Sequence, residues 1–227
     1  MIRWVRRWWY WGVDYGYVVW WQLVGLVSRR PPRTFLSGSK APVVLLPGVY
    51  EPWALLRPIA DALGAAGHPI HVVRPLGYNR RPISESAATV MSYILEHDLR
   101  GVVLVAHSKG GLIGKHCMVV DDLTGRIDRV VAVATPFAGS TLARYVPSRT
   151  VRALGPRAET IGLLAANLEA NSRIVSIYGD YDPHIPGGSY LAGAQNIEIP
   201  MVGHFRPLGD RRVIAAVVDA VSRSRGA

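Results

Sequence analysis

Short apolar runs alternate with amphipathic stretches along most of this chain. The runs predict strands at residues 43–46, 71–73, 102–105, 130–133, 174–178 and 197–199. Between them, apolar positions with helical spacing predict helices at 52–66, 84–99, 110–123, 160–170 and 210–222. Strands that are apolar on both faces and alternate with helices indicate an α/β fold. We expect a doubly wound, mostly parallel sheet with helices on both faces.

The first 40 residues differ in composition from the rest. Six of the seven tryptophans lie there, as do seven basic residues against one acidic residue, Asp14. The pattern predicts a Trp-rich, basic N-terminal segment and linker at residues 1–40 and one domain at residues 41–227. The single cysteine, Cys117, excludes an internal disulfide framework.

The N-terminal segment is long enough to interact with a membrane. Residues 8–27 are mostly apolar, but Asp14, Gln22 and several glycines weaken a bilayer span. Arginine mixed with aromatic residues favours a membrane surface over nucleic acid. We expect residues 1–30 to form an interfacial anchor, with a true span or an aromatic helix packed on the domain or on a second copy as alternatives. No cleavable signal peptide is evident, and we expect a membrane-associated protein on the cytoplasmic face.

One stretch indicates the chemistry. The strand at 102–105 leads directly into Ala106-His107-Ser108-Lys109-Gly110, after which helical spacing begins. Small residues two positions before and after Ser108 allow the strand and helix backbones to pass closely. The turn would expose the Ser108 hydroxyl at a helix N-terminus, where developing negative charge is favoured. A simple serine helix cap is the alternative interpretation.

This stretch resembles the Gly-x-Ser-x-Gly nucleophile elbow of the α/β-hydrolase family, in particular of small bacterial lipases and esterases. Lys109 is its main departure, because an uncharged residue is commoner there. We expect the Lys109 ammonium to pair with a carboxylate, with an anionic substrate group as the alternative partner. The resemblance covers about residues 42–222. It implies a small sheet of about six strands, because the family's first two strands have no counterpart here.

The resemblance also implies a catalytic base and an acid, in the chain order Ser, Asp, His. His204 lies in the loop after the last predicted strand, where the family carries its base; His184 is a weaker rival. The family's spacing after the penultimate strand selects Asp182 as the acid, with Asp180 as the alternative.

The remaining site residues follow from the same loops. An oxyanion needs two N–H donors, and we expect the backbone N–H groups of Val49 and Lys109 to supply them. Residues 137–157 are expected to form a short lid. The expected substrate contacts are Tyr50, His107, Phe137, Leu142 and Tyr145.

These features predict a serine hydrolase that cleaves carboxylic esters, lipid-like ones in particular, through a Ser108-His204-Asp182 triad and an acyl-enzyme. An acyltransferase on the same scaffold and a non-catalytic membrane-binding protein remain alternatives. No phosphate-cradling glycine loop or metal-ligand cluster stands out in the sequence, so we expect no cofactor, no metal and no nucleic-acid partner.

Overall fold

Six strands form the central sheet of the protein. The structure, a computed structural model, describes the backbone of residues 2–27 and 33–223 and the side chains of residues 12–26 and 35–223. Within these ranges the strands form one sheet in the order β2-β1-β3-β4-β5-β6, and each neighbouring pair is parallel. Their bounds are β1 Val43–Leu46, β2 Ile70–Val72, β3 Val102–His107, β4 Ile127–Val133, β5 Ile174–Tyr181 and β6 Gln195–Val202. The predicted fold class is confirmed.

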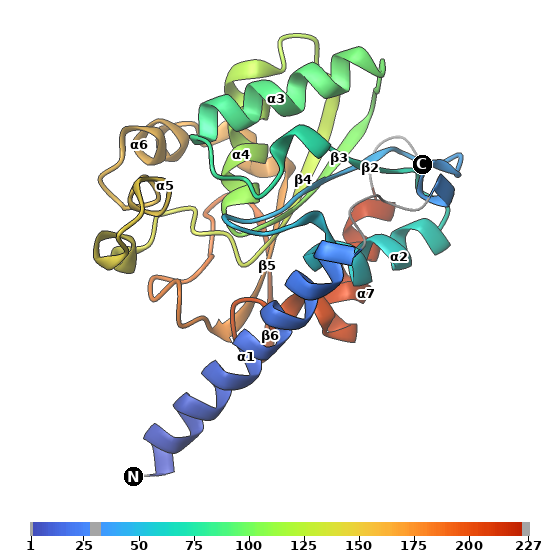
Figure 1. Ribbon diagram of the computed structural model, residues 1–227. Coiled ribbons are helices and arrows are strands. Elements are labelled where there is room, and N and C mark those ends of the chain that lie inside the picture. Colours follow the sequence, from blue (N-terminus) through green and yellow to red (C-terminus); the bar gives the residue numbers. More distant parts are fainter. Residues whose placement is uncertain (1, 28–32, 224–227) are drawn as a thin grey trace.

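Helices cover both faces of this sheet (Figure 1). Their bounds are α1 Ile2–Val27, α2 Arg57–Ala65, α3 Ile83–Glu96, α4 Lys109–His116, α5 Arg149–Arg152, α6 Glu159–Ala166 and α7 Arg211–Ser222. Successive strand residues point to opposite faces. In β1, Val43 and Leu45 join the core that contains α2 and α7, whereas Val44 and Leu46 join the core that contains α3, α4 and α6. Burial on both faces explains why β1 is apolar throughout.

Some helix ends differ from the predicted ones for local reasons. The helix expected to run to residue 123 leaves α-helical geometry after His116 and closes with a π-helical turn over Cys117–Asp121. His116 Nδ1 lies 2.7 Å from an Asp121 carboxylate oxygen, and the Asp122 carboxylate accepts two N–H groups of the following loop. These side-chain contacts compete with continued α-helical hydrogen bonding. The 137–157 insert holds only a short 3-10 helix, Thr141–Tyr145, and α5.

Helix α1 packs against the domain along one side. Asp14 is buried, Tyr17 and Trp21 contact the core, and a Cβ at Gly25 would lie 2.9 Å from a side-chain carbon of Pro52. Among the described residues, no helix combines the length and apolar character that crossing a bilayer requires. The side chains of Trp4, Trp8, Trp9, Trp11 and the flanking arginines lie outside the described part of the chain, so the expectation that they contact a membrane stays a prediction.

Candidate active site

Ser108 lies at a strained bend between β3 and α4. Its backbone has φ 51° and ψ −119°, a conformation that costs a residue with a Cβ about 1–3 kcal/mol. Glycine after the bend permits the close packing that holds it. A Cβ at Gly110 would lie 2.0 Å from the carbonyl oxygen of Leu46, and one at Gly111 would lie 2.1 Å from Thr135 Oγ1. The bend therefore depends on glycine at these positions, and it places Ser108 at the carboxyl end of β3.

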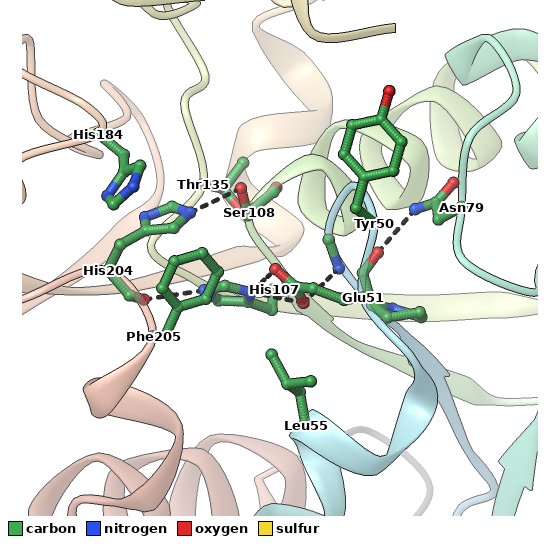
Figure 2. A network of polar contacts seen from close by, with 12 residues as sticks. Tyr50, Glu51, Leu55, Asn79, His107, Ser108, Thr135, His184, His204 and Phe205 are labelled. Atoms are coloured by element: carbon green, nitrogen blue, oxygen red, sulfur yellow. Dashed lines mark hydrogen bonds and ion pairs between the residues drawn. The ribbon is translucent and has the colours of Figure 1, made fainter. Parts of the chain in front are cut away.

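Ser108, His204 and Asp182 meet above the carboxyl ends of the strands. Ser108 Oγ lies 3.0 Å from His204 Nε2, and His204 Nδ1 lies 2.6 Å from an Asp182 carboxylate oxygen (Figure 2 shows the first contact). A carboxylate can only accept, so Nδ1 carries the proton of a neutral imidazole and Nε2 is free to accept the hydroxyl proton. All three side chains are at most 7% exposed. The geometry is that of a nucleophile, a base and an orienting acid.

Charge and burial shift the pKa of Asp182, and likewise that of His204, in opposite directions. Burial opposes ionisation of Asp182, but the His204 charge, its hydrogen bond and the backbone N–H of His184 together lower the Asp182 pKa. Burial alone would lower the pKa of His204, but the neighbouring Asp182, Glu51 and Asp14 carboxylates raise it above its ordinary value. The imidazole is therefore more basic than burial alone would leave it.

The alternative acid and base occupy different places. Asp180 is exposed near the end of β5, whereas Asp182 is buried against His204. His184 lies beside the pair, its ring centroid 4.8 Å from that of His204, and its Nε2 lies 3.0 Å from the Tyr15 hydroxyl. Burial next to His204 lowers the pKa of His184 to about 4. The ring whose nitrogen lies within hydrogen-bond distance of Ser108 Oγ is that of His204.

The loop after β1 supplies the second backbone donor beside Ser108. The N–H of Val49 has no hydrogen-bond partner among the described residues, and Val49 lines the same cavity as Ser108. Lys109 begins α4, and the first N–H groups of a helix have no partner within it. Both donors predicted for an oxyanion are therefore available.

A buried pair that the sequence did not predict supports this loop. Glu51 accepts the Gly48 N–H at 2.7 Å and lies 2.9 Å from His107 Nδ1, while His107 Nε2 lies 2.9 Å from the His204 carbonyl (Figure 2). A carbonyl only accepts, so Nε2 carries a proton, and Glu51 and His107 share one further proton between them. The pair links the loop after β1 to the backbone of the base.

A cavity of about 420 Å³ opens beside Ser108. Its lining is mostly apolar and comes from α1, the loop after β1, the 137–157 insert, and the loops that carry Asp182 and His204. The lining residues include Tyr15, Val18, Gln22, Val49, Tyr50, Leu142, Ala143, Val146, Val151, Leu154, Ile185 and Phe205. The participation of α1 was not predicted, because no local signal in the sequence indicates which surface a helix covers.

Only some of the predicted substrate contacts line this cavity. Tyr50 and Leu142 do, but the other three do not. His107 is fully buried beneath the bend, and Phe137 belongs to the core under the insert. Tyr145 is 68% exposed and stacks with Arg144 instead. The structure therefore places these three expected contacts outside the cavity beside Ser108.

The Lys109 side chain turns away from the cavity. Its ammonium donates to the backbone carbonyls of Asn79 and Arg81 and to the Asn79 side-chain oxygen. Burial lowers the Lys109 pKa to about 8. Its partners are these oxygens and not a carboxylate, contrary to the expected pairing, and they hold the 79–81 loop at the start of α4. Because Lys109 does not line the cavity beside Ser108, the alternative of an anionic substrate group is not supported.

One set of ligand atoms in the described residues is close enough to hold a metal ion. Asp182, His184 and His204 offer atoms within 4.8 Å of one another. However, both nitrogens of His204 already contact Asp182 and Ser108. Metal binding through either nitrogen of His204 would have to displace the contact that this nitrogen makes.

No family model matches the sequence, and no curated protein does either. Similar solved structures include lipase B of Aspergillus fumigatus, 16% identical with a TM-score of 0.66, covering 84% of this chain and 54% of that one. An α/β hydrolase, MGS-MChE2, from a lagoon-sediment metagenome is 14% identical (TM-score 0.60; 81% of this chain, 90% of that one). The enol-lactonase of Burkholderia xenovorans is 15% identical with a TM-score of 0.58, and the match covers 82% of this chain and 93% of that one. At these identities the likeness concerns the fold, and that fold is the one of the α/β-hydrolases.

Proposed function

We propose that this protein is a serine hydrolase that cleaves carboxylic esters with lipid-like acyl groups. The proposal is carried by the continuous contact from Ser108 through His204 to buried Asp182. A serine hydroxyl is a weak nucleophile at neutral pH unless an adjacent base removes its proton. The lipase and the enol-lactonase among the similar structures act on ester bonds, which supports the same bond type here.

In the first half of the reaction, Ser108 Oγ attacks the ester carbonyl carbon while His204 Nε2 accepts the hydroxyl proton. The carbonyl π electrons move onto oxygen, and the N–H groups of Val49 and Lys109 stabilise that oxyanion. Each such donor typically contributes about 10²–10³ in kcat. Asp182 stabilises the imidazolium, which then protonates the leaving alkoxide as the C–O bond breaks. Ser108 is left as an acyl ester.

Water completes the cycle by the same route. His204 Nε2 accepts a proton from water as its oxygen attacks the acyl carbon, and the second tetrahedral intermediate expels Ser108 Oγ. The imidazolium returns the proton to Oγ, which regenerates the free enzyme and releases the acid. One ester and one water thus yield one alcohol and one carboxylic acid.

The size and apolar lining of the cavity beside Ser108 favour a substrate with an apolar acyl group. Its volume of about 420 Å³ lies within the usual range for small-molecule sites. Leu142, Val146, Val151 and Leu154 supply an aliphatic wall from the insert. Burial of methylenes there contributes about 0.8 kcal/mol each, which favours longer acyl chains over acetate until the cavity is full.

The exposed apolar residues on the outer side of α1 favour a protein that acts at a lipid surface. Val13, Val19, Trp20, Leu23 and Leu26 are between 37% and 63% exposed. Their helical spacing places them opposite the side that docks on the domain. An exposed apolar stripe of this kind, continued by a basic Trp-rich segment in sequence, matches an interfacial helix.

The decisive experiment is labelling with a fluorophosphonate probe. Wild-type protein should be labelled, Ser108→Ala should not, and the control Ser92→Ala, at an exposed helical serine, should be labelled like wild type. Persistent labelling of Ser108→Ala would exclude Ser108 as the nucleophile. A p-nitrophenyl ester series should then show kcat/KM rising from acetate to medium chains, with free acid as the product.

A further inference from the structure

Asp14 is a buried carboxylate that contacts the loop of the proposed base. It comes from α1, lies 190 residues before His204 in the chain and is 1% exposed. One oxygen accepts the N–H of His204 at 3.0 Å, and the other accepts those of Phe205 and Arg206 at 2.9 Å each. Three consecutive backbone donors therefore converge on one side chain from a distant helix.

The loop is built to receive this carboxylate. Gly203 has φ +129°, and a Cβ there would lie 2.7 Å from Asp14 Oδ1. A side chain at residue 203 would therefore crowd the contact. Without Asp14, three N–H groups in a water-poor site would lose their acceptor, and buried donors without acceptors are unfavourable. The loop conformation that presents the His204 ring is consequently coupled to the docking of α1.

The same helix contacts the other two segments of the site. The Tyr15 hydroxyl lies 3.0 Å from His184 Nε2, on the loop that carries Asp182. The Gln22 amide donates to the Tyr50 carbonyl at 2.9 Å, next to Val49. The loop that carries His204, the loop that carries Asp182 and the loop after β1 thus each make a hydrogen bond with one face of α1.

We propose that Asp14 is a positioning residue for His204, and that α1 is a part of the active site itself. The inference rests on the proposed function for its kinetic consequence. Its structural consequence does not depend on that function, because the surroundings of the His204 ring can be measured directly. If α1 only tethered the enzyme, substitution of Asp14 would leave both the kinetics and the surroundings of the His204 ring unchanged.

Removing the Asp14 charge should also change the titration of His204. The ring is surrounded by several titratable groups on different elements: the carboxylates of Asp182, Glu51 and Asp14, the imidazoles of His184 and His107, and the Ser108 hydroxyl. The carboxylates favour the imidazolium and the two neighbouring imidazoles oppose it. Loss of one carboxylate should lower the His204 pKa, whereas general loosening that exposes the ring to water would raise it.

The test compares Asp14→Asn and Asp14→Ala with Asp61→Asn, a control at an exposed aspartate of α2. NMR titration of the His204 ring should give a lower pKa in both Asp14 variants than in wild type. On soluble p-nitrophenyl butyrate, Asp14→Ala should lower kcat by about 10- to 100-fold with KM within about twofold, as expected for small misplacement of a base. Asp14→Asn, which keeps an oxygen acceptor, should recover part of kcat, and Asp61→Asn should match wild type.

An unchanged His204 titration in folded Asp14 variants would overturn the inference, whatever the kinetics show. Unchanged kcat with intact Ser108 labelling would overturn the positioning role while leaving the proposed hydrolase in place. Conversely, a shifted His204 titration in a protein that no probe labels would support the coupling of α1 to the loop and reject the hydrolase. Thermal melts of each variant confirm that folded protein is compared.

Discussion

In the proposed reaction His204 has to be neutral to accept the Ser108 proton, so its pKa should determine the pH below which activity is lost. Its pKa is raised above the ordinary 6.5, because the neighbouring carboxylates outweigh burial. Below that raised pKa the ring is protonated and cannot act as a base. We therefore expect kcat/KM to fall with decreasing pH, with a midpoint above 6.5. A pH–rate profile on a soluble ester measures this midpoint, and a midpoint below the ordinary histidine value would contradict it.

Replacement of Asp182 by asparagine should separate orientation from charge. The variant loses the carboxylate that fixes the Nδ1–H tautomer, and kcat should fall about 10³–10⁴-fold, as in other triads. Burial of His204 remains while its main anionic partner is gone, so the residual activity should have its acid limb at lower pH. The exposed Asp180→Asn variant is the matched control and should behave as wild type. Equal losses in both variants would show that the acid is misassigned.

At this scale, the sequence was informative wherever a residue type and its loop position both constrain the chemistry. Ser108, Asp182 and His204 each follow a strand, and parallel strands bring such positions together. The Glu51–His107 pair was missed because nothing local distinguishes a buried glutamate from an exposed one. Asp14 was also missed, since its partners are backbone N–H groups, which every residue other than proline carries.

The unit of β3, bend and α4 carries Ser108, the proposed nucleophile, and its geometry depends on glycines without a side chain. Gly110 faces the Leu46 carbonyl on neighbouring β1, so the helix can approach the sheet only without a Cβ at that position. The number and approximate positions of the strands were predicted well, because short apolar runs between helices have few other solutions. Helix ends were predicted less well. The termination after His116 depends on the Asp121 and Asp122 side chains, whose local contacts outweigh the helical spacing that continues beyond them.

Gly110→Ala should destabilise the fold, because its Cβ would lie 2.0 Å from a backbone oxygen. We expect a loss of about 2–4 kcal/mol in the free energy of unfolding. Gly162→Ala is the matched control within α6, where a Cβ would meet nothing within 4 Å. That variant should gain about 0.5–1 kcal/mol from helix propensity. Urea unfolding of both proteins tests the contrast, and similar free energies for the two variants would contradict the close-approach argument.

For the whole molecule, α1 has two different faces. Its inner face, with Asp14, Tyr17, Trp21 and Gly25, docks on the domain, while Trp20 and Leu23 lie on the exposed side. The helical backbone of α1 extends from the docked turns away from the sheet (Figure 1). The composition of the first 40 residues indicated a separate membrane-associating segment. It did not indicate that one side of the same helix completes the cavity beside Ser108.

The two faces should therefore be separable by substitution. Trp20→Ser combined with Leu23→Ser removes apolar surface from the outer face only, so binding to vesicles of phosphatidylcholine and phosphatidylglycerol should weaken about tenfold or more. Hydrolysis of soluble p-nitrophenyl butyrate should stay within about twofold of wild type, because neither side chain lines the cavity beside Ser108. Leu123→Ser is the control, at a leucine that is 92% exposed in the loop before β4, and it should leave vesicle binding unchanged. Vesicle co-sedimentation and ester assays on the same preparations measure both properties. Equal vesicle binding by the outer-face variant and the Leu123 control would mean that the exposed stripe serves another partner, such as a second copy of the chain.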